Sequence, residues 1–207
     1  MKSALTVVYF SGILAQLIIR APYAARARKL KKVRKQTTAS EQLVLGVLTL
    51  GGLVLPVIYA LTDWLAFADY PFPASITTVL GVVGVLILTA GLWLFWRAHH
   101  DLGVYWSPSL ELSAGHRLVT EGIYASIRHP MYASQFLFGL SQAFLVQNWI
   151  AGLGGLLAFL LLYFVRVPKE ENMMLEQFGD QYHEYCTRTG RILPRFRREP
   201  RWPAEDT

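Results

Sequence analysis

Long runs of apolar residues, separated by polar stretches, dominate the pattern of this chain. The interior of each run carries no charged residue, and each run is too long for an ordinary strand. A helix needs about 20 apolar residues to cross the hydrocarbon core of a bilayer. The pattern therefore predicts an all-α polytopic membrane protein with about five transmembrane helices, at Ala4–Ile19, Leu43–Leu61, Ala74–Trp96, Met131–Asn148 and Trp149–Val165.

Residues at the ends and inside these runs add detail to the predicted helices. The fourth and fifth runs touch at Gln147-Asn148, which predicts a tight helical hairpin. Pro130 lacks a backbone N–H and suits the first turn of the fourth helix. Pro56 is expected to kink the second helix, a break that neighbouring helices can absorb.

Composition agrees with a membrane protein and excludes several other classes. The chain is 53% hydrophobic with one cysteine, Cys186, so neither an internal disulfide nor a thiolate zinc cluster is expected. The mean hydropathy is +0.32. Residues 1–207 leave no room for a separate soluble module, which predicts a single domain. The net charge of +6 sits at the ends of the apolar runs, a distribution that fits a membrane better than nucleic acid.

The charges between the runs predict how the chain is oriented. Only Asp63 and Asp69 lie between the second and third runs, which places that loop outside. The polar segments 97–130 and 166–207 are rich in arginine and are expected on the cytoplasmic side, which puts the N-terminus outside and the C-terminus inside. Eight basic residues between the first two runs agree: Arg20, Arg26, Arg28, Lys29, Lys31, Lys32, Arg34 and Lys35.

Most residues that could carry chemistry lie in the two polar segments expected at this cytoplasmic end. The apolar runs hold no ionisable groups of the kind that ion-coupled transporters need within the bilayer. Arg128 and His129 precede the helix start at Pro130, where backbone N–H groups attract anions. An ordinary interfacial cap explains the same residues equally well. A membrane scaffold and an enzyme at the membrane surface both remain open at this point.

The segment after the fifth run offers a second set of candidates. Arg166 and Glu170 are four residues apart and share a helix face if the helix continues past Pro168. They could form a surface ion pair, or an arginine fork that holds a substrate carboxylate while Glu170 contacts a cofactor. One amphipathic face is predicted beyond them from helical spacing, at Leu175, Phe178, Tyr182 and Tyr185.

Two groups of motifs stand out in the polar segments. The first group is His116-Arg117-Leu118-Val119, Gly122-Ile123-Tyr124 and Arg128-His129-Pro130-Met131-Tyr132. The second is Glu170-Glu171, Phe178-Gly179, Tyr182, Tyr185, Arg188 and Pro194. Together they resemble the isoprenylcysteine carboxyl methyltransferase family, whose cofactor signature is shared in part by phospholipid N-methyltransferases. The resemblance covers about residues 107–194, the expected cofactor-binding part.

The resemblance implies S-adenosylmethionine, bound on the cytoplasmic side. Arg166 and Glu170 are the implied catalytic residues, and Arg166 is the implied substrate contact. Ser109 stands where the eukaryotic enzymes use a glutamine, so its contact with the cofactor is open. The implied cofactor-binding residues are His116, Leu118, Val119, Tyr124, His129, Pro130, Met131, Tyr132 and Glu170.

These expectations combine into one predicted function. The chain is expected to methylate the carboxylate of an isoprenylcysteine-like lipophilic substrate, without a metal or a covalent enzyme intermediate. The alternatives are a phospholipid (phosphatidylethanolamine) N-methyltransferase and a non-catalytic membrane scaffold. The expected partners are membrane lipids and a lipophilic small-molecule or prenylated substrate, whereas nucleic acid is not expected. The compact chain favours a prokaryotic cytoplasmic membrane.

Overall fold

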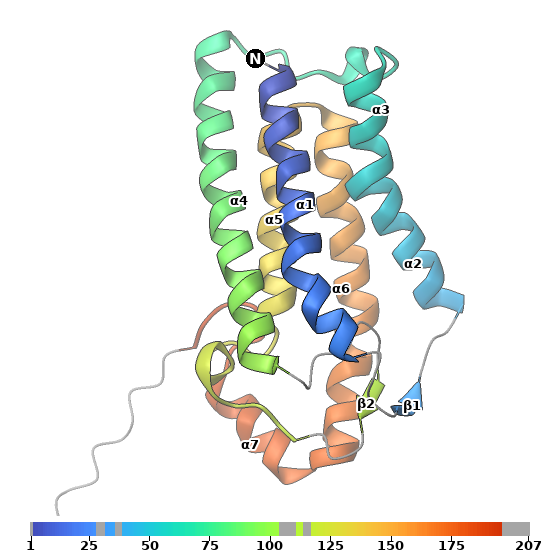
Figure 1. Ribbon diagram of the computed structural model, residues 1–207, viewed down its shortest axis with the longest axis vertical. Coiled ribbons are helices and arrows are strands. Elements are labelled where there is room, and N and C mark those ends of the chain that lie inside the picture. The colour runs from blue at the N-terminus through green and yellow to red at the C-terminus, as the bar shows by residue number, and fades with distance from the viewer. Residues whose placement is uncertain (1, 28–31, 36–38, 104–110, 114–116, 196–207) are drawn as a thin grey trace, which may run out of the picture.

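A computed structural model describes residues 2–27, 32–35, 39–103, 111–113 and 117–195. Its main body is a bundle of long helices that run roughly along one axis (Figure 1). Helix α5 (Pro130–Val146) packs against α4 (Ala74–Leu102), α6 (Trp149–Phe178) and α1 (Lys2–Ala27). The second crossing packs on α6 and consists of α2 (Ala39–Thr49), the π-helical turn η1 (Leu50–Val54) and α3 (Leu55–Leu61).

The predicted helical membrane bundle is confirmed, and the chain is an integral membrane protein. Four helices in the described ranges are long and apolar enough to cross a membrane: Ala4–Ala27, Gln42–Leu61, Ala74–Leu102 and Trp149–Phe178. Helix α5 accounts for the remaining predicted span and has 17 residues, which makes it about 26 Å long. That length is slightly less than the roughly 30 Å of a typical hydrocarbon core.

Two short strands are an addition to the all-α prediction. Strand β1 (Lys32–Lys35) pairs antiparallel with β2 (Glu111–Ser113) at the end of the bundle that also holds α7 (Figure 1). Two 3₁₀ turns, η2 (Ala66–Ala68) and η4 (Gly122–Ala125), lie in the loops at opposite ends.

The break expected at Pro56 takes the form of the π-helical turn η1, which ends two residues before the proline. Proline has no N–H, so Pro56 cannot donate to the carbonyl of Gly52 four residues earlier. That carbonyl instead accepts a hydrogen bond from the hydroxyl of Tyr9 on α1. The neighbouring carbonyl of Gly51 accepts from Nε2 of Gln142 on α5, at 2.8 Å. Neighbouring helices thus satisfy the carbonyls that the break exposes.

The predicted hairpin between the last two membrane helices is also present. Gln147 adopts a left-handed backbone conformation with φ 52°, and Asn148 caps the start of α6. The Asn148 side chain accepts from the N–H groups of Ile150 and Ala151. Its amide donates to the carbonyl of Leu65 at 2.7 Å, which fastens the hairpin to the loop after α3.

The end of α6 differs from the prediction of one amphipathic face. Helix α6 continues through Pro168 to Phe178, and Gly179, with φ +53°, turns the chain into α7 (Asp180–Arg188). A positive φ is a conformation that glycine adopts without strain. Because of this turn, Tyr182 and Tyr185 are buried while Leu175 stays 41% exposed. Figure 1 shows α7 beneath the bundle, at the end opposite the N-terminus.

Candidate functional site

Glu170 lies where side chains from α5 and α6 meet, beyond the apolar part of α6. Because α6 continues through Pro168, Arg166 sits one turn before Glu170, and its Nε donates to Glu170 Oε1 at 3.1 Å. The hydroxyl of Tyr132, in the first turn of α5, donates to the same oxygen at 2.8 Å. Nδ1 of His129 faces Glu170 Oε2 at 3.8 Å. The expected face shared by Arg166 and Glu170 is therefore present, and it includes two side chains from a second helix.

Glu171, the next residue, is surrounded by three basic side chains. Its Oε1 accepts from Arg128 Nε at 2.8 Å and lies 3.2 Å from His129 Nε2. Arg191 holds both carboxylate oxygens, with Nε to Oε1 at 3.2 Å and Nη2 to Oε2 at 2.6 Å. The hydrogen bonds to Glu171 and its negative charge raise the pKa of the Arg191 guanidinium above its usual value. Only 11% of the Glu171 side chain is exposed, so these partners compensate a largely buried charge.

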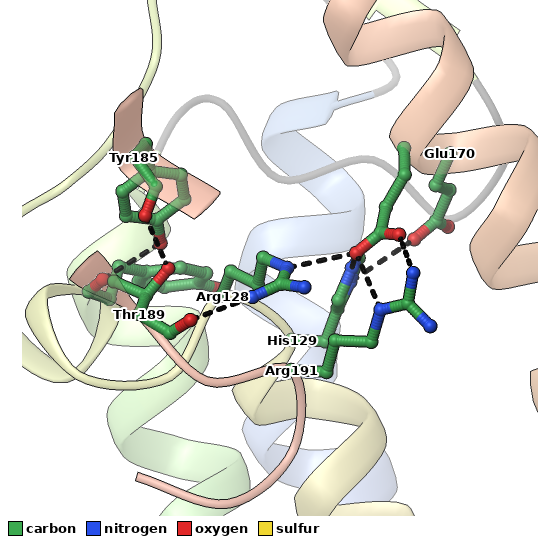
Figure 2. Close-up of polar contacts among 8 residues, drawn as sticks. Arg128, His129, Glu170, Tyr185, Thr189 and Arg191 are labelled. Atoms are coloured by element: carbon green, nitrogen blue, oxygen red, sulfur yellow. Dashed lines mark hydrogen bonds and ion pairs between the residues drawn. The ribbon is translucent and has the colours of Figure 1, made fainter. Parts of the chain in front are cut away.

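Residues Thr189–Arg195, here called the C-terminal strap, lie across the start of α5. The N–H groups of Arg128 and His129 donate to the carbonyls of Gly190 and Arg191, both at 2.9 Å. Nη1 of Arg128 donates to the carbonyl of Thr189 at 2.7 Å. Figure 2 shows Arg128, His129 and Arg191 converging on the glutamate carboxylates. The strap thus holds the backbone of the two residues that directly precede α5.

Tyr124 has a different environment from the other expected cofactor residues. It is buried within η4, and its carbonyl accepts from the hydroxyl of Tyr185 on α7 at 2.7 Å. Its own hydroxyl donates to the carbonyl of Ala98 on α4 at 3.4 Å. Burial raises the pKa of the Tyr185 hydroxyl, which therefore stays protonated and able to donate. Tyr124 therefore connects α4, η4 and α7 near Glu170 and Glu171.

Apart from Tyr124, the expected site residues fall into three groups. The structure brings Arg166, Glu170, Tyr132 and His129 together. Pro130, which follows His129, is the first residue of α5. Met131 is half-buried in the same helical turn, and Leu118 and Val119 are half-buried in the irregular segment before η4. Their contacts with a cofactor stay predictions. His116 and Ser109 lie outside the described residues.

The sequence placed Glu171 in a motif shared with the family but not among the predicted site residues, and it gave Arg191 no role. The adjacent Glu170-Glu171 pair after a membrane helix was a usable signal, because a second buried carboxylate requires basic partners. Arg191 had no comparable signal, since it is one of several arginines in the C-terminal segment. In the part of the chain that the structure describes, no group of three or more His, Cys, Asp or Glu side chains could hold a metal ion.

The comparisons with known proteins agree with this geometry. The model of the isoprenylcysteine carboxyl methyltransferase family matches residues 82–176. The predicted resemblance to this family is confirmed. Human protein-S-isoprenylcysteine O-methyltransferase is 32% identical over 141 residues, which cover 65% of this chain and 49% of the relative. The Schizosaccharomyces pombe protein of the same name is 37% identical over 79 residues, covering 38% and 34%.

A solved structure of the family shares the fold. The eukaryotic intramembrane Ras methyltransferase ICMT matches 91% of this chain and 62% of its own chain, with a TM-score of 0.52 and 23% identity. The match to the human relative spans about half of that protein. The matched family segment contains α5, the residues just before it and most of α6. It therefore includes Arg128, His129, Tyr132, Arg166, Glu170 and Glu171.

Proposed function

We propose that this chain transfers a methyl group from S-adenosylmethionine to the carboxylate of an isoprenylcysteine-like lipophilic substrate. One observation carries the proposal: Arg166, Tyr132 and His129 all face the carboxylate of Glu170. One candidate substrate contact and three candidate cofactor contacts thereby lie in one place. The names of the human and fission yeast relatives support carboxyl O-methylation rather than phospholipid N-methylation.

The residues around Glu170 fit the chemistry of the proposed cofactor. When bound, S-adenosylmethionine supplies a methyl group on a sulfonium sulfur, and it also carries ammonium, hydroxyl and amino donors. The Glu170 carboxylate, with 22% of its side chain exposed, is an acceptor that such donors can reach. Tyr132 and Arg166 hold this carboxylate in a fixed orientation through their bonds to Oε1.

Arg166 suits the proposed acceptor because of its chemistry and its place. It directly follows the last residue of the apolar run on α6, where the carboxyl end of a membrane-embedded lipid could reach it. A guanidinium presents five N–H donors in a planar fork that matches a carboxylate, which a lysine ammonium cannot reproduce. Its side chain is only 13% exposed, so a carboxylate held there would be partly desolvated.

The proposed reaction requires no general base. S-adenosylmethionine held beside Glu170 would supply an electrophilic methyl group, and Arg166 would hold the substrate carboxylate, which is already ionised and nucleophilic. No proton moves, so the chain would act by orientation and partial desolvation of the carboxylate. An amine acceptor would instead have to lose a proton.

The proposed orientation places this site in the cytoplasm and the N-terminus outside. In Figure 1 the N-terminus lies at the end of the bundle opposite α7. The loop at the N-terminal end holds Asp63 and Asp69, whereas Arg128, Arg166 and Arg191 lie at the other end. This distribution supports a cytoplasmic site under the positive-inside rule.

The test uses labelled S-adenosylmethionine with a farnesyl-cysteine analogue and, separately, with phosphatidylethanolamine. Arg166→Lys should strongly depress methylation of the farnesyl-cysteine analogue while S-adenosylhomocysteine binding persists. Arg97→Lys is the matched control, since Arg97 forms the same kind of pair, four residues apart, with Asp101 on α4. Methylation of the phospholipid alone, insensitive to Arg166→Lys, would instead establish the N-methyltransferase. Transfer to neither acceptor would support the scaffold.

A further inference from the structure

His129 lies between the two glutamates, with one ring nitrogen facing each of them. Nε2 lies 3.2 Å from Glu171 Oε1, and Nδ1 lies 3.8 Å from Glu170 Oε2. Glu171 also accepts from two arginines, which keep its carboxylate ionised. An ionised carboxylate can only accept, so the His129 nitrogen that bonds to it must carry the hydrogen. Glu171 therefore specifies Nε2–H.

Arg191 controls this arrangement from the C-terminal strap. Its guanidinium holds both oxygens of Glu171, and its backbone carbonyl accepts the N–H of His129 at 2.9 Å. Arg191 thus fixes His129 through its side chain, by way of Glu171, and through its backbone. The Arg191 side chain is 55% exposed and that of Glu171 only 11%, so Arg191 covers the carboxylate from the solvent side.

Glycine at position 190 lets the strap lie in this place. A Cβ added to Gly190 would lie 1.9 Å from the carbonyl oxygen of Leu193, closer than two such atoms can approach. The N–H groups of Gly190 and Arg195 both donate to the carbonyl of Ser126 at 3.1 Å, just before the start of α5. The strap is thus bonded to the backbone along its length, and it presents Arg191 in a fixed position.

We infer that Arg191 and Glu171 are positioning residues that set the hydrogen-bonding state of His129. They hold Nε2–H toward Glu171, which turns Nδ1 of the same ring toward Glu170 Oε2 at 3.8 Å. That separation is too long for a direct hydrogen bond, so Glu170 Oε2 can accept from a further donor. The inference rests on the proposed function, in which S-adenosylmethionine supplies that donor through its ammonium, hydroxyl or amino groups.

The test reads the histidine ring directly, by nitrogen NMR of protein labelled with ¹⁵N-histidine, without ligand and at neutral pH. The His129 signal is assigned from its loss in His129→Gln. The inference predicts a hydrogen on Nε2 in the wild-type chain. Arg191→Gln should lower the fraction of rings that carry a hydrogen on Nε2, and S-adenosylhomocysteine should bind about tenfold more weakly.

Matched variants separate positioning from a general loss of structure. Arg195→Gln removes the same charge from the same strap and keeps the Arg195 N–H bond to Ser126, so neither readout should change. Arg191→Lys should lie between wild type and Arg191→Gln, because an ammonium cannot hold both oxygens in a planar fork. If gel filtration shows that Arg191→Gln does not fold, Arg191→Lys and Glu171→Gln provide the comparison.

Two results would overturn the inference: an Nε2 without hydrogen in the wild-type chain, or folded strap variants that leave both the Nε2 hydrogen and the affinity unchanged. Failure of the proposed function gives a different result. A wild-type chain that does not bind S-adenosylhomocysteine would refute the function, while the ligand-free spectra would still decide whether Arg191 and Glu171 fix the ring.

Discussion

Replacing Glu170 with alanine tests the central carboxylate of the site. This carboxylate accepts from the Tyr132 hydroxyl at 2.8 Å and from Arg166 Nε at 3.1 Å. Glu170→Ala leaves these two donors without their shared acceptor and removes the proposed contact with the cofactor. The side chain lies at the polar end of α6, outside the apolar cores, so the helices should still assemble.

The expected loss of affinity follows from the value of one hydrogen bond to a charged group. Such a bond contributes about 1.5–3 kcal/mol, and its removal leaves its partners unsatisfied. A loss of that size corresponds to a roughly 10- to 150-fold larger dissociation constant. Tyr132 and Arg166 also lose their common orientation, so the expected effect is at least about tenfold.

Isothermal titration calorimetry with S-adenosylhomocysteine measures this loss in purified protein. Glu184→Ala is the matched control, because Glu184 on α7 is 69% exposed and its pair with Arg188 lies on the surface. The control should bind with wild-type affinity, since exposed ion pairs contribute little. Folded Glu170→Ala protein with wild-type affinity would refute the assignment of Glu170 to the cofactor site.

Two further predictions concern the orientation of the chain and the hairpin at the end opposite the site. A reporter that is active only in the cytoplasm should give a signal when fused to the C-terminus and none at the N-terminus; a cytoplasmic signal at the N-terminus would contradict the proposed orientation. Asn148→Ala removes the cap of α6 and should cost about 1–2 kcal/mol, seen as a lower melting temperature. Its affinity for S-adenosylhomocysteine should be unchanged, and an unaltered melting temperature would show that the cap does not matter.

The sequence predicted where the helices cross the membrane better than where they end. Hydropathy marked the apolar run up to Val165, but α6 continues to Phe178 because polar residues extend a helix beyond the bilayer. Similarly, α1 continues beyond the predicted Ile19 to Ala27. Strands β1 and β2 were missed since Lys32–Lys35 is largely basic and lacks the alternating pattern that predicts strands.

Local spacing explains which parts of the candidate site were predictable. Arg166 and Glu170 are four residues apart, so helical geometry alone brings them together. Arg191 and Glu171 are twenty residues apart. Their contact requires both the turn at Gly179 and the path of the strap over the start of α5. No periodic pattern specifies such a path, so long-range hydrogen bonds had to be found in the structure.

The most direct test of the proposed function is the chemical nature of the methylated product. Purified wild-type chain is incubated with methyl-labelled S-adenosylmethionine and a farnesyl-cysteine analogue, and the product is treated with alkali. A carboxyl methyl ester is cleaved by alkali, so the account predicts that the label is released as methanol. Label that stays in an alkali-stable methyl group, or no transfer to the analogue at all, would contradict carboxyl methylation.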